Sequence, residues 1–314
     1  MIKEKIRDQA FKLGYDLVGF ASATQHAHLS FYKRWLEKKY QGEMKYLERH
    51  FDPKSNPQSL LPNAKSFICV ALNYNPGPPP NPNDPLIARY TVGLDYHHTF
   101  KTKLQQLADF IQKELDPTAR LRVFVDTGPI LERSYAVAAG LGWIGKNTLL
   151  INRKMGSWLF LGEILTDMDL MPDSFETDHC GTCTRCIDAC PTQALTPYEL
   201  KATQCISYWT LEQKSEFSEY QKNNLGNHLA GCDICQEVCP WNRKAPLTQH
   251  PEFYYRPELQ GIDWHDPQTA TVEFFDQTFK PSSMHYMGFD KYYRNLMVCN
   301  ANEMPNQTAQ HERS

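Results

Sequence analysis

The sequence predicts an α+β protein in three parts: an N-terminal part of α/β type, a cysteine-rich middle segment and a short α-helical C-terminal segment. Three observations support this fold class. Apolar runs bounded by turn-forming residues alternate with helical patterns up to about residue 167. Eight of the ten cysteines lie between Cys180 and Cys239, and helical patterns return after them. We therefore expect the 314 residues to divide into 1–167, 168–245 and 246–314.

Hydrophobic spacing and turn residues predict the regular elements of the chain. Gly14 is a plausible stop for a first helix, and the repeat of Phe100, Leu104 and Leu107 is typical of an amphipathic helix. Pro129 suits a first helical position and Gly140 a helix stop, so a helix is expected between them. The predicted helices are 2–13, 29–40, 100–115, 129–139, 267–279 and 289–300, and the predicted strands are 16–20, 66–74, 121–125 and 157–166.

Two stretches of the N-terminal part are candidates for ligand contact. We expect residues 95–98, which contain Tyr96, His97 and His98, to form a loop that touches a ligand. The adjacent histidines are poor metal ligands because neighbouring side chains diverge on a helix or strand. Residues 140–147 contain three glycines spaced as in G-x-G-x-x-G, but they follow a helix rather than a strand. These glycines suit a backbone that lies close against a bulky ligand.

Asp126 follows the predicted strand 121–125, at the edge where ligands meet α/β sheets. By itself this position favours a structural role, as a turn or helix-start residue before Thr127-Gly128-Pro129.

The cysteine-rich segment predicts two [4Fe–4S] clusters. It opens with a C-x₂-C-x₂-C-x₃-C-P run, the pattern of bacterial two-cluster ferredoxins. The closing run, C-x₂-C-x₃-C-P, is one cysteine short, so the lone Cys205 must supply the missing ligand. The analogy with these ferredoxins assigns Cys180, Cys183, Cys186 and Cys239 to one cluster, and Cys190, Cys205, Cys232 and Cys235 to the other.

Zinc and disulfides are the alternative explanations for the cysteines. Structural zinc takes four ligands in C-x₂-C pairs, which does not explain a run of three plus one that ends in proline. Disulfide frameworks belong to small secreted chains, and this sequence shows no sign of secretion.

Composition and charge restrict the cellular setting and the partners. The formal net charge of −3 argues against a uniformly basic nucleic-acid binder, although local basic patches remain compatible with it. One dense basic stretch spans residues 33–49. A nucleic-acid contact is one explanation for it, and a solvated helix face is the alternative. The N-terminus lacks the apolar core of a signal peptide, and no run approaches the roughly 20 apolar residues of a membrane span. We expect a protein of the reducing cytoplasm with no membrane association.

Three segments together resemble the epoxyqueuosine reductase family. They are residues 125–133 (VDTGPILER), residues 139–147 (AGLGWIGKN) and the eight-cysteine pattern with Cys205. Residues 42–44, 88–90 and 95–97 look similar too. The resemblance covers nearly the whole chain to about residue 245. This family removes the epoxide oxygen of epoxyqueuosine at the wobble position of tRNA, and it is related to corrinoid-dependent reductive dehalogenases.

The resemblance implies cobalamin, two [4Fe–4S] clusters and a tRNA substrate. It also implies that Asp126 is the general acid that protonates the departing epoxide oxygen. The resemblance thus favours a catalytic role for Asp126 over the role of a turn or helix-start residue. The cofactor contacts that it implies are Arg49, Arg89, Tyr96, His97, Asp126, Gly142, Lys146, Asn147, Leu150, Ser157 and Leu161.

Two other functions remain as alternatives. One is a different corrinoid and iron–sulfur reductase, such as a reductive dehalogenase that acts on a small molecule. The other is a ferredoxin-type electron carrier, for which the 167 residues before the clusters would be excessive. The reductase function further requires an electron-donor protein or another reductant, and we expect a monomer.

Overall fold

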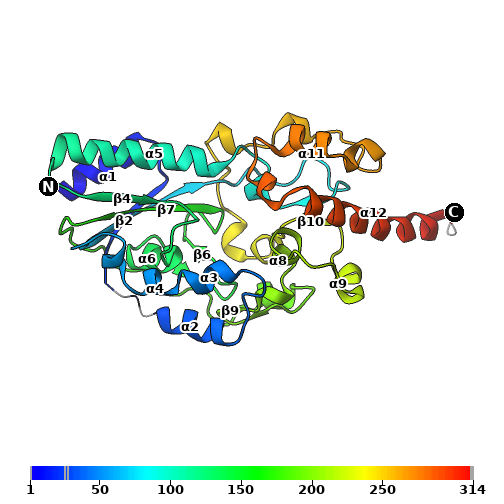
Figure 1. Ribbon diagram of the computed structural model, residues 1–314, viewed down its shortest axis with the longest axis horizontal. Helices are drawn as coiled ribbons and strands as arrows, with labels where there is room; N and C mark the ends of the chain where they lie inside the picture. Colours follow the sequence, from blue (N-terminus) through cyan, green and yellow to red (C-terminus); the bar gives the residue numbers. More distant parts are fainter. Residues whose placement is uncertain (1, 25, 27, 312–314) are drawn as a thin grey trace.

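The computed structural model describes residues 2–24, 26 and 28–311. Within these residues, four strands form the central sheet in the order β1-β2-β7-β4 (Figure 1). Every neighbouring pair in this sheet is antiparallel. The α+β class is therefore confirmed, but the α/β-type arrangement is wrong, because apolar runs reveal strands without their direction. The strands are β1 (Leu17–Ser22), β2 (Ser66–Asn73), β7 (Leu159–Thr166) and β4 (Leu121–Phe124).

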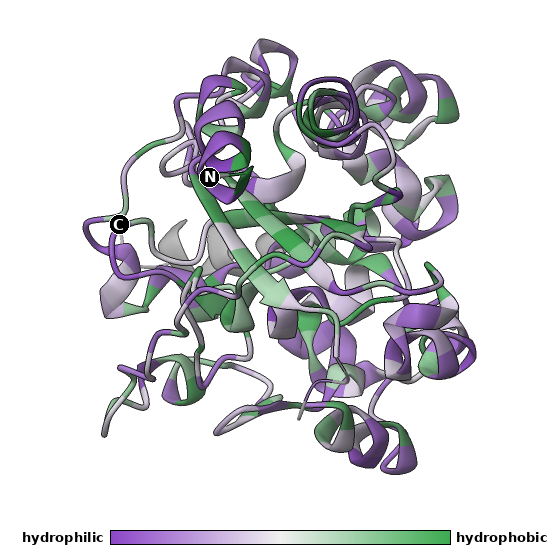
Figure 2. Cartoon of the chain, turned by 90° about the vertical axis from the view of Figure 1, so that its left-hand side faces the viewer, coloured by the Kyte–Doolittle hydropathy of each residue, from purple (hydrophilic) through white to green (hydrophobic). Residues whose placement is uncertain are grey.

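Helices cover both faces of the sheet. On one face lie α1 (Ile2–Lys12) and α5 (Tyr96–Phe110), whose buried Ile6, Phe100 and Leu104 belong to one apolar core. On the other face lies α6 (Glu132–Ala138), whose Tyr135 and Ala136 belong to a second core. Figure 2 shows the strands in the hydrophobic colour between helices whose outer sides are polar. Burial of these apolar faces holds the layers together.

The predicted helix stops at Gly14 and Gly140 are confirmed. Both glycines have a positive φ, +86° and +77°, which glycine adopts without a Cβ penalty. At the end of α6, the Gly140 N–H donates to Val137 O (2.9 Å) and the Leu141 N–H donates to Ala136 O (3.0 Å). This pair of bonds is the Schellman motif, which satisfies the last carbonyls of the helix.

Two predicted helix starts are wrong. The helix expected from Pro129 begins at Glu132, because residues 125–131 first turn back through local contacts. The predicted loop at 95–98 is instead the first turn of α5. Asp95 caps this helix by accepting the N–H of His97 at 3.0 Å. His97 and His98 are neighbours on a helix, where adjacent side chains do not face each other. A π-helical turn, Ile111–Leu115, extends α5.

Short helices and strands surround the sheet. The basic stretch forms α2 (Leu29–Glu37) and α3 (Lys45–Arg49), followed by α4 (Phe51–Ser55). The cysteine-rich segment contains α7 (Arg185–Asp188), α8 (Ile206–Leu211), α9 (Glu219–Asn224) and α10 (Ile234–Glu237). Two-stranded pairs join β5 (Trp143–Ile144) with β6 (Leu150–Ile151), β8 (Leu195–Thr196) with β9 (Glu199–Leu200), and β3 (Leu86–Ile87) with β10 (His228–Ala230).

The C-terminal part consists of α11 (Val272–Phe279) and α12 (Phe289–His311). A third apolar core joins these helices to the cysteine-rich segment, with Trp209, Leu229 and Phe275 among its members. Because this core crosses residue 245, the division into 1–167, 168–245 and 246–314 stays a prediction. Across the described ranges, none of the helices has the length and apolar character that a membrane crossing requires.

Candidate active site

A cavity of about 340 Å³ lies between the sheet and the cysteine-rich segment. On the sheet side its walls include the aromatic rings of Tyr74, Tyr96 and Phe160. Carboxyl side chains reach it from Asp126 and Glu132. On the opposite side it is lined by Cys190, Cys205, Cys232 and Cys235. Enclosed, largely apolar cavities with a few polar groups are typical of cofactor and substrate sites.

Asp126 occupies a strained turn at the rim of this cavity. Its φ is +51°, in the left-handed region that few residues other than glycine, asparagine and aspartate adopt. The Nε2 of His97 lies 3.2 Å from Asp126 Oδ2, and the Nδ1 of His97 lies 2.7 Å from Asp95 Oδ1. Burial lowers the pKa of His97, but the two carboxylates outweigh it, so the pKa is raised overall. The histidine thus holds Asp126 in place between the sheet and α5.

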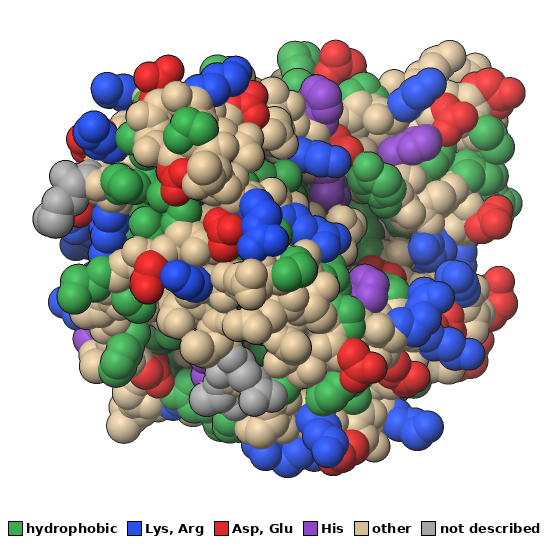
Figure 3. Space-filling model, turned by 60° about the vertical axis from the view of Figure 1, so that its left-hand side comes forward, with side chains coloured by type: hydrophobic (Ala, Val, Ile, Leu, Met, Phe, Trp, Pro, Cys, Tyr) green, Lys and Arg blue, Asp and Glu red, His purple; other side chains and the backbone are tan. Residues whose placement is uncertain are grey.

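A second, wider cleft of about 840 Å³ meets the cavity at Asp126. Tyr90, Tyr96 and Asp126 line both spaces. Figure 3 shows basic and histidine side chains around a hollow on this side of the molecule. The basic and histidine residues that line the cleft are His50, Lys54, His97, Lys101 and Lys291. Asp126 therefore stands between a positively charged cleft and a cavity that leads to cysteines.

The eight cysteines influence one another in two groups. Burial raises the pKa of Cys186, and the charges of Cys239, Cys180 and Cys183 raise it further. Burial also raises the pKa of Cys232, to about 12, and among the smaller contributions Cys205 and Cys190 act in the same direction. Burial likewise raises the pKa of Cys235, and Cys232 and Cys205 act on it most strongly after burial. Cys186 acts on Cys235 as well, so the two groups are neighbours.

No three Cys, His, Asp or Glu side chains among the described residues converge closely enough to hold a single metal ion. A [4Fe–4S] cube binds each cysteine through a different iron, so its ligands stand further apart than those of one ion.

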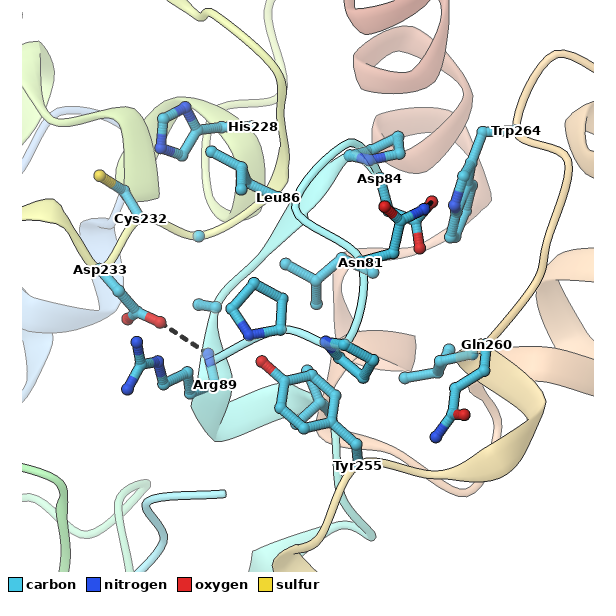
Figure 4. Close-up of a pocket in the computed structure, with 18 of the residues that line it drawn as sticks. Asn81, Asp84, Leu86, Arg89, His228, Cys232, Asp233, Tyr255, Gln260 and Trp264 are labelled. Carbon is cyan, nitrogen blue, oxygen red and sulfur yellow. Dashed lines mark hydrogen bonds between the residues drawn. The ribbon is translucent and has the colours of Figure 1, made fainter. Parts of the chain in front are cut away.

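The structure brings together six of the predicted cofactor contacts. Tyr96, Asp126, Asn147, Leu150, Ser157 and Leu161 all line the cavity. His97 lines the wider cleft. Arg89 lines an adjoining cavity of about 370 Å³, where its backbone N–H donates to Asp233 Oδ2 at 2.7 Å (Figure 4).

Three further predicted contacts lie outside these walls. A Cβ on Gly142 would collide with the carbonyl oxygen of Ile151. Glycine is therefore required at this position because the chain packs closely against itself, and not because a bulky ligand lies there. Lys146 donates to the carbonyls of Gly181 (2.6 Å) and Cys183 (3.0 Å) and so holds the first cysteine loop. Arg49 is exposed at the end of α3.

Sequence reasoning missed several residues of the site. Lys54 and Lys291 line it, but no motif or periodicity distinguishes them from surface charges. Glu132 lines it as well, and its place within the motif of residues 125–133 was a signal for it. Tyr90 lay within the segment 88–90 that resembles the family, which was a signal for it.

Comparison with known proteins identifies the family. Residues 179–242 match the family described as 4Fe-4S double cluster binding domain. Residues 54–127 match the family described as Epoxyqueuosine reductase QueG, DUF1730. The chain is 41% identical over 295 residues to the epoxyqueuosine reductase of Leadbetterella byssophila, which covers 93% of this chain and 96% of the relative. The chain belongs to the epoxyqueuosine reductase family. The Pseudomonas aeruginosa enzyme is 39% identical over 305 residues, or 95% of this chain and 84% of that one.

Solved structures of this family have the same fold. A crystal structure of epoxyqueuosine reductase with a tRNA-Tyr epoxyqueuosine-modified tRNA stem loop matches with a TM-score of 0.86 and 31% identity. The match covers 96% of this chain and 81% of the other. The Streptococcus thermophilus enzyme matches with a TM-score of 0.83 and 32% identity over the same shares. The chain is thus an oxidoreductase that converts epoxyqueuosine to queuosine in tRNA, and it carries a 4Fe-4S double-cluster domain, as the sequence predicted.

Proposed function

We propose that the reduction of epoxyqueuosine takes place at Asp126, with cobalamin in the 340 Å³ cavity and the modified nucleotide in the wider cleft. The observation that carries this proposal is the position of Asp126 where the two spaces meet. Cysteines line one of these spaces and lysines line the other. An acid at this junction can reach a substrate that arrives from the cleft while electrons arrive from the cysteine side.

The cavity fits a corrin in its chemistry. Leu150, Phe160 and Leu161 offer an apolar wall, and Asn147 and Ser157 place polar groups beside it. We propose that Tyr96, Asn147, Leu150, Ser157 and Leu161 hold the cofactor. When bound, cobalamin supplies a cobalt centre that accepts electrons singly and reacts at the epoxide carbon. Arg49, Arg89, Gly142 and Lys146 are left out of this set because they lie elsewhere.

Leu161→Trp should abolish cobalamin retention, because the larger ring would occupy part of the cavity. Leu161→Met conserves the volume and should retain cobalamin as the wild type does. Visible absorbance of the purified protein after incubation with cobalamin and gel filtration measures retention, and iron analysis shows that the clusters persist. Equal retention by both variants would contradict this placement of the cofactor.

Two [4Fe–4S] clusters fit the two groups of cysteines. We propose that Cys180, Cys183, Cys186 and Cys239 hold the first, and that Cys190, Cys205, Cys232 and Cys235 hold the second. The second group lines the cavity, so it would pass electrons to the bound cofactor. Cys180 and Cys239 pack around Trp143 and Trp241, away from the cavity, and an electron-donor protein or another reductant would reach this first group.

Asp126 is the proposed general acid. The Bacillus subtilis epoxyqueuosine reductase, 30% identical with a TM-score of 0.84, has been solved with an aspartate catalytic loop swung out of the active site. Asp126 likewise lies on a turn, between β4 and α6, and His97 restrains it. The imidazole would keep the carboxyl oriented and stabilise the carboxylate that remains after proton transfer.

The wider cleft is the proposed binding site for tRNA. Lys101 and Lys291 line it and can face phosphates. Two other lysines are engaged within the protein and are left out of this site: Lys103 pairs with Glu252 at 3.7 Å, and Lys146 binds the cysteine loop.

Lys101→Gln combined with Lys291→Gln should weaken tRNA binding at low salt and reduce the slope of log K against log salt by about 1 to 2, since each lost phosphate contact removes about 0.7 to 0.9. Lys113→Gln is the matched control, because Lys113 is exposed near the opposite end of the same helical stretch. Binding is measured by fluorescence anisotropy over a salt series. Identical slopes for the pair and the control would refute the assignment.

A further inference from the structure

The chemistry of the reaction requires two protons at one oxygen. Reduction of an epoxide to an alkene breaks both carbon–oxygen bonds of the ring and takes up two electrons. The oxygen leaves as water, so it acquires two protons. The electrons come from the reductant through the clusters. Asp126 holds a single proton, and a substrate that fills the cleft excludes bulk water from it. A second proton source beside Asp126 is therefore needed during the turnover.

Glu132 lies beside Asp126 and has no part in the mechanism so far. It is the first residue of α6 and lines the same cavity as Asp126. The backbone N–H of Asp126 faces its carboxyl group. Its Oε1 is buried and finds no hydrogen-bond partner among the described residues. A buried carboxyl oxygen with no partner is costly as an anion and much less so as a neutral acid.

The surroundings of Glu132 keep it protonated near neutral pH. Burial raises its pKa to about 8, and the charge of Asp126 acts in the same direction. Arg133 and Lys54 oppose this shift without cancelling it. Behind Glu132, on β7, Glu163 is fully buried, and neither of its carboxyl oxygens has a partner within the described part of the chain. The titratable and charged groups around Glu132 are Asp126, Arg133, Lys54, Glu163, Tyr96 and the buried thiol of Cys69.

We propose that Glu132 is the second acid of the active site and delivers the second proton that the departing oxygen takes, either directly or by reloading Asp126. This inference rests on the proposed role of Asp126. In the balanced step, the O–H bond of the Glu132 carboxyl breaks, the proton ends in the water that leaves, and Glu132 remains as a carboxylate until solvent reprotonates it. The carboxyl group keeps this proton between turnovers because it is buried and its Oε1 has no partner, among the residues that the structure describes, that would stabilise the anion.

His97 is the competing source of this proton. It contacts Asp126 at 3.2 Å from the side of the wider cleft, and its side chain is 22% exposed. A histidine in this place can also reload Asp126. The two candidates are distinguished by which substitution changes the dependence of the rate on pH.

The test compares single-turnover rates of the reduced, cobalamin-loaded enzyme between pH 6 and pH 10. Glu132 must be protonated to donate, so the wild-type rate should show a decline as pH rises through about 8. Glu132→Gln keeps the shape and removes the proton. We expect its rate to fall by about 10²-fold or more and its decline near pH 8 to disappear. Glu132→Asp should restore part of the rate and a basic decline.

Glu163→Gln is the matched control, since it removes another buried carboxyl that does not line the cavity. It should leave the rate and its decline near pH 8 in place. Infrared titration of the unloaded protein gives a readout without turnover. A protonated-carboxyl component that is lost with a midpoint near pH 8 should be present in the wild type and in Glu163→Gln and missing from Glu132→Gln, in which the absorbance of protonated Glu163 remains.

Three outcomes would overturn the inference: a wild-type rate in Glu132→Gln, a slow Glu132→Gln whose decline near pH 8 persists, or a decline that is lost only in His97→Gln. Failure of the proposed function looks different, because Asp126→Asn would then turn over at the wild-type rate whatever Glu132→Gln does.

Discussion

Asp126→Asn should lower the single-turnover rate by a factor of about 10² to 10⁴, the usual contribution of a general acid. Asparagine has the same shape and also tolerates the left-handed conformation at φ +51°, so the turn should persist. It carries no acidic proton for the departing oxygen. Folding, cluster content and cobalamin retention should therefore match the wild type while the chemical step slows. The measurement is the rate of queuosine formation in tRNA, normalised to bound cobalamin.

The alternative is that Asp126 only shapes the turn between β4 and α6. In that case Asp126→Asn would change the stability little, because asparagine is as well tolerated as aspartate at such positions, and the folded fraction would react at the normal rate. Thermal unfolding measured beside the rate separates the two roles. A normal rate in Asp126→Asn would move the acid role to Asp95, Tyr96 or His97.

Cys205→Ala should remove one cluster, halve the iron content and abolish turnover. Cys205 is the one proposed ligand outside the two cysteine runs, at the start of α8, where the backbone N–H groups of Tyr208 and Ser207 face its sulfur. Its loss leaves the cluster beside the cavity with three cysteines, so electrons no longer reach the substrate. The first group contains none of the changed atoms and should keep its cluster. Iron analysis and electron paramagnetic resonance of the reduced protein check both statements.

Cys69→Ala serves as the control for this experiment. Cys69 is buried in β2 against Glu163 rather than in the cysteine-rich segment, so its loss should leave iron and electron transfer intact. Two intact clusters in Cys205→Ala would show that another residue supplies the missing ligand.

Local sequence was sufficient where short-range chemistry decides the structure. Three predictions of this kind were correct: the double-cluster segment from the spacing of the cysteines, the helix stops at Gly14 and Gly140, and the amphipathic helix α5. Each depends on neighbours within a few residues. The predicted start at Pro129 failed although it also relied on a local rule, because the strained turn at Asp126 uses up the residues that would have formed the first helical turn. The family and its reaction were also accessible, since the motifs around Asp126, Gly142 and Cys205 occur in one chain.

The sequence by itself thus determined the α+β class, the presence of a 4Fe-4S double-cluster segment and the reaction. Tertiary structure alone decided the antiparallel order β1-β2-β7-β4, because strand direction depends on contacts between distant segments. It also decided that Gly142 packs against Ile151 and that Lys146 binds the cysteine loop. The junction at Asp126 and the buried carboxyl of Glu132 arise in the same way: burial and proximity set the pKa of a side chain, and both are properties of the folded chain rather than of any local pattern.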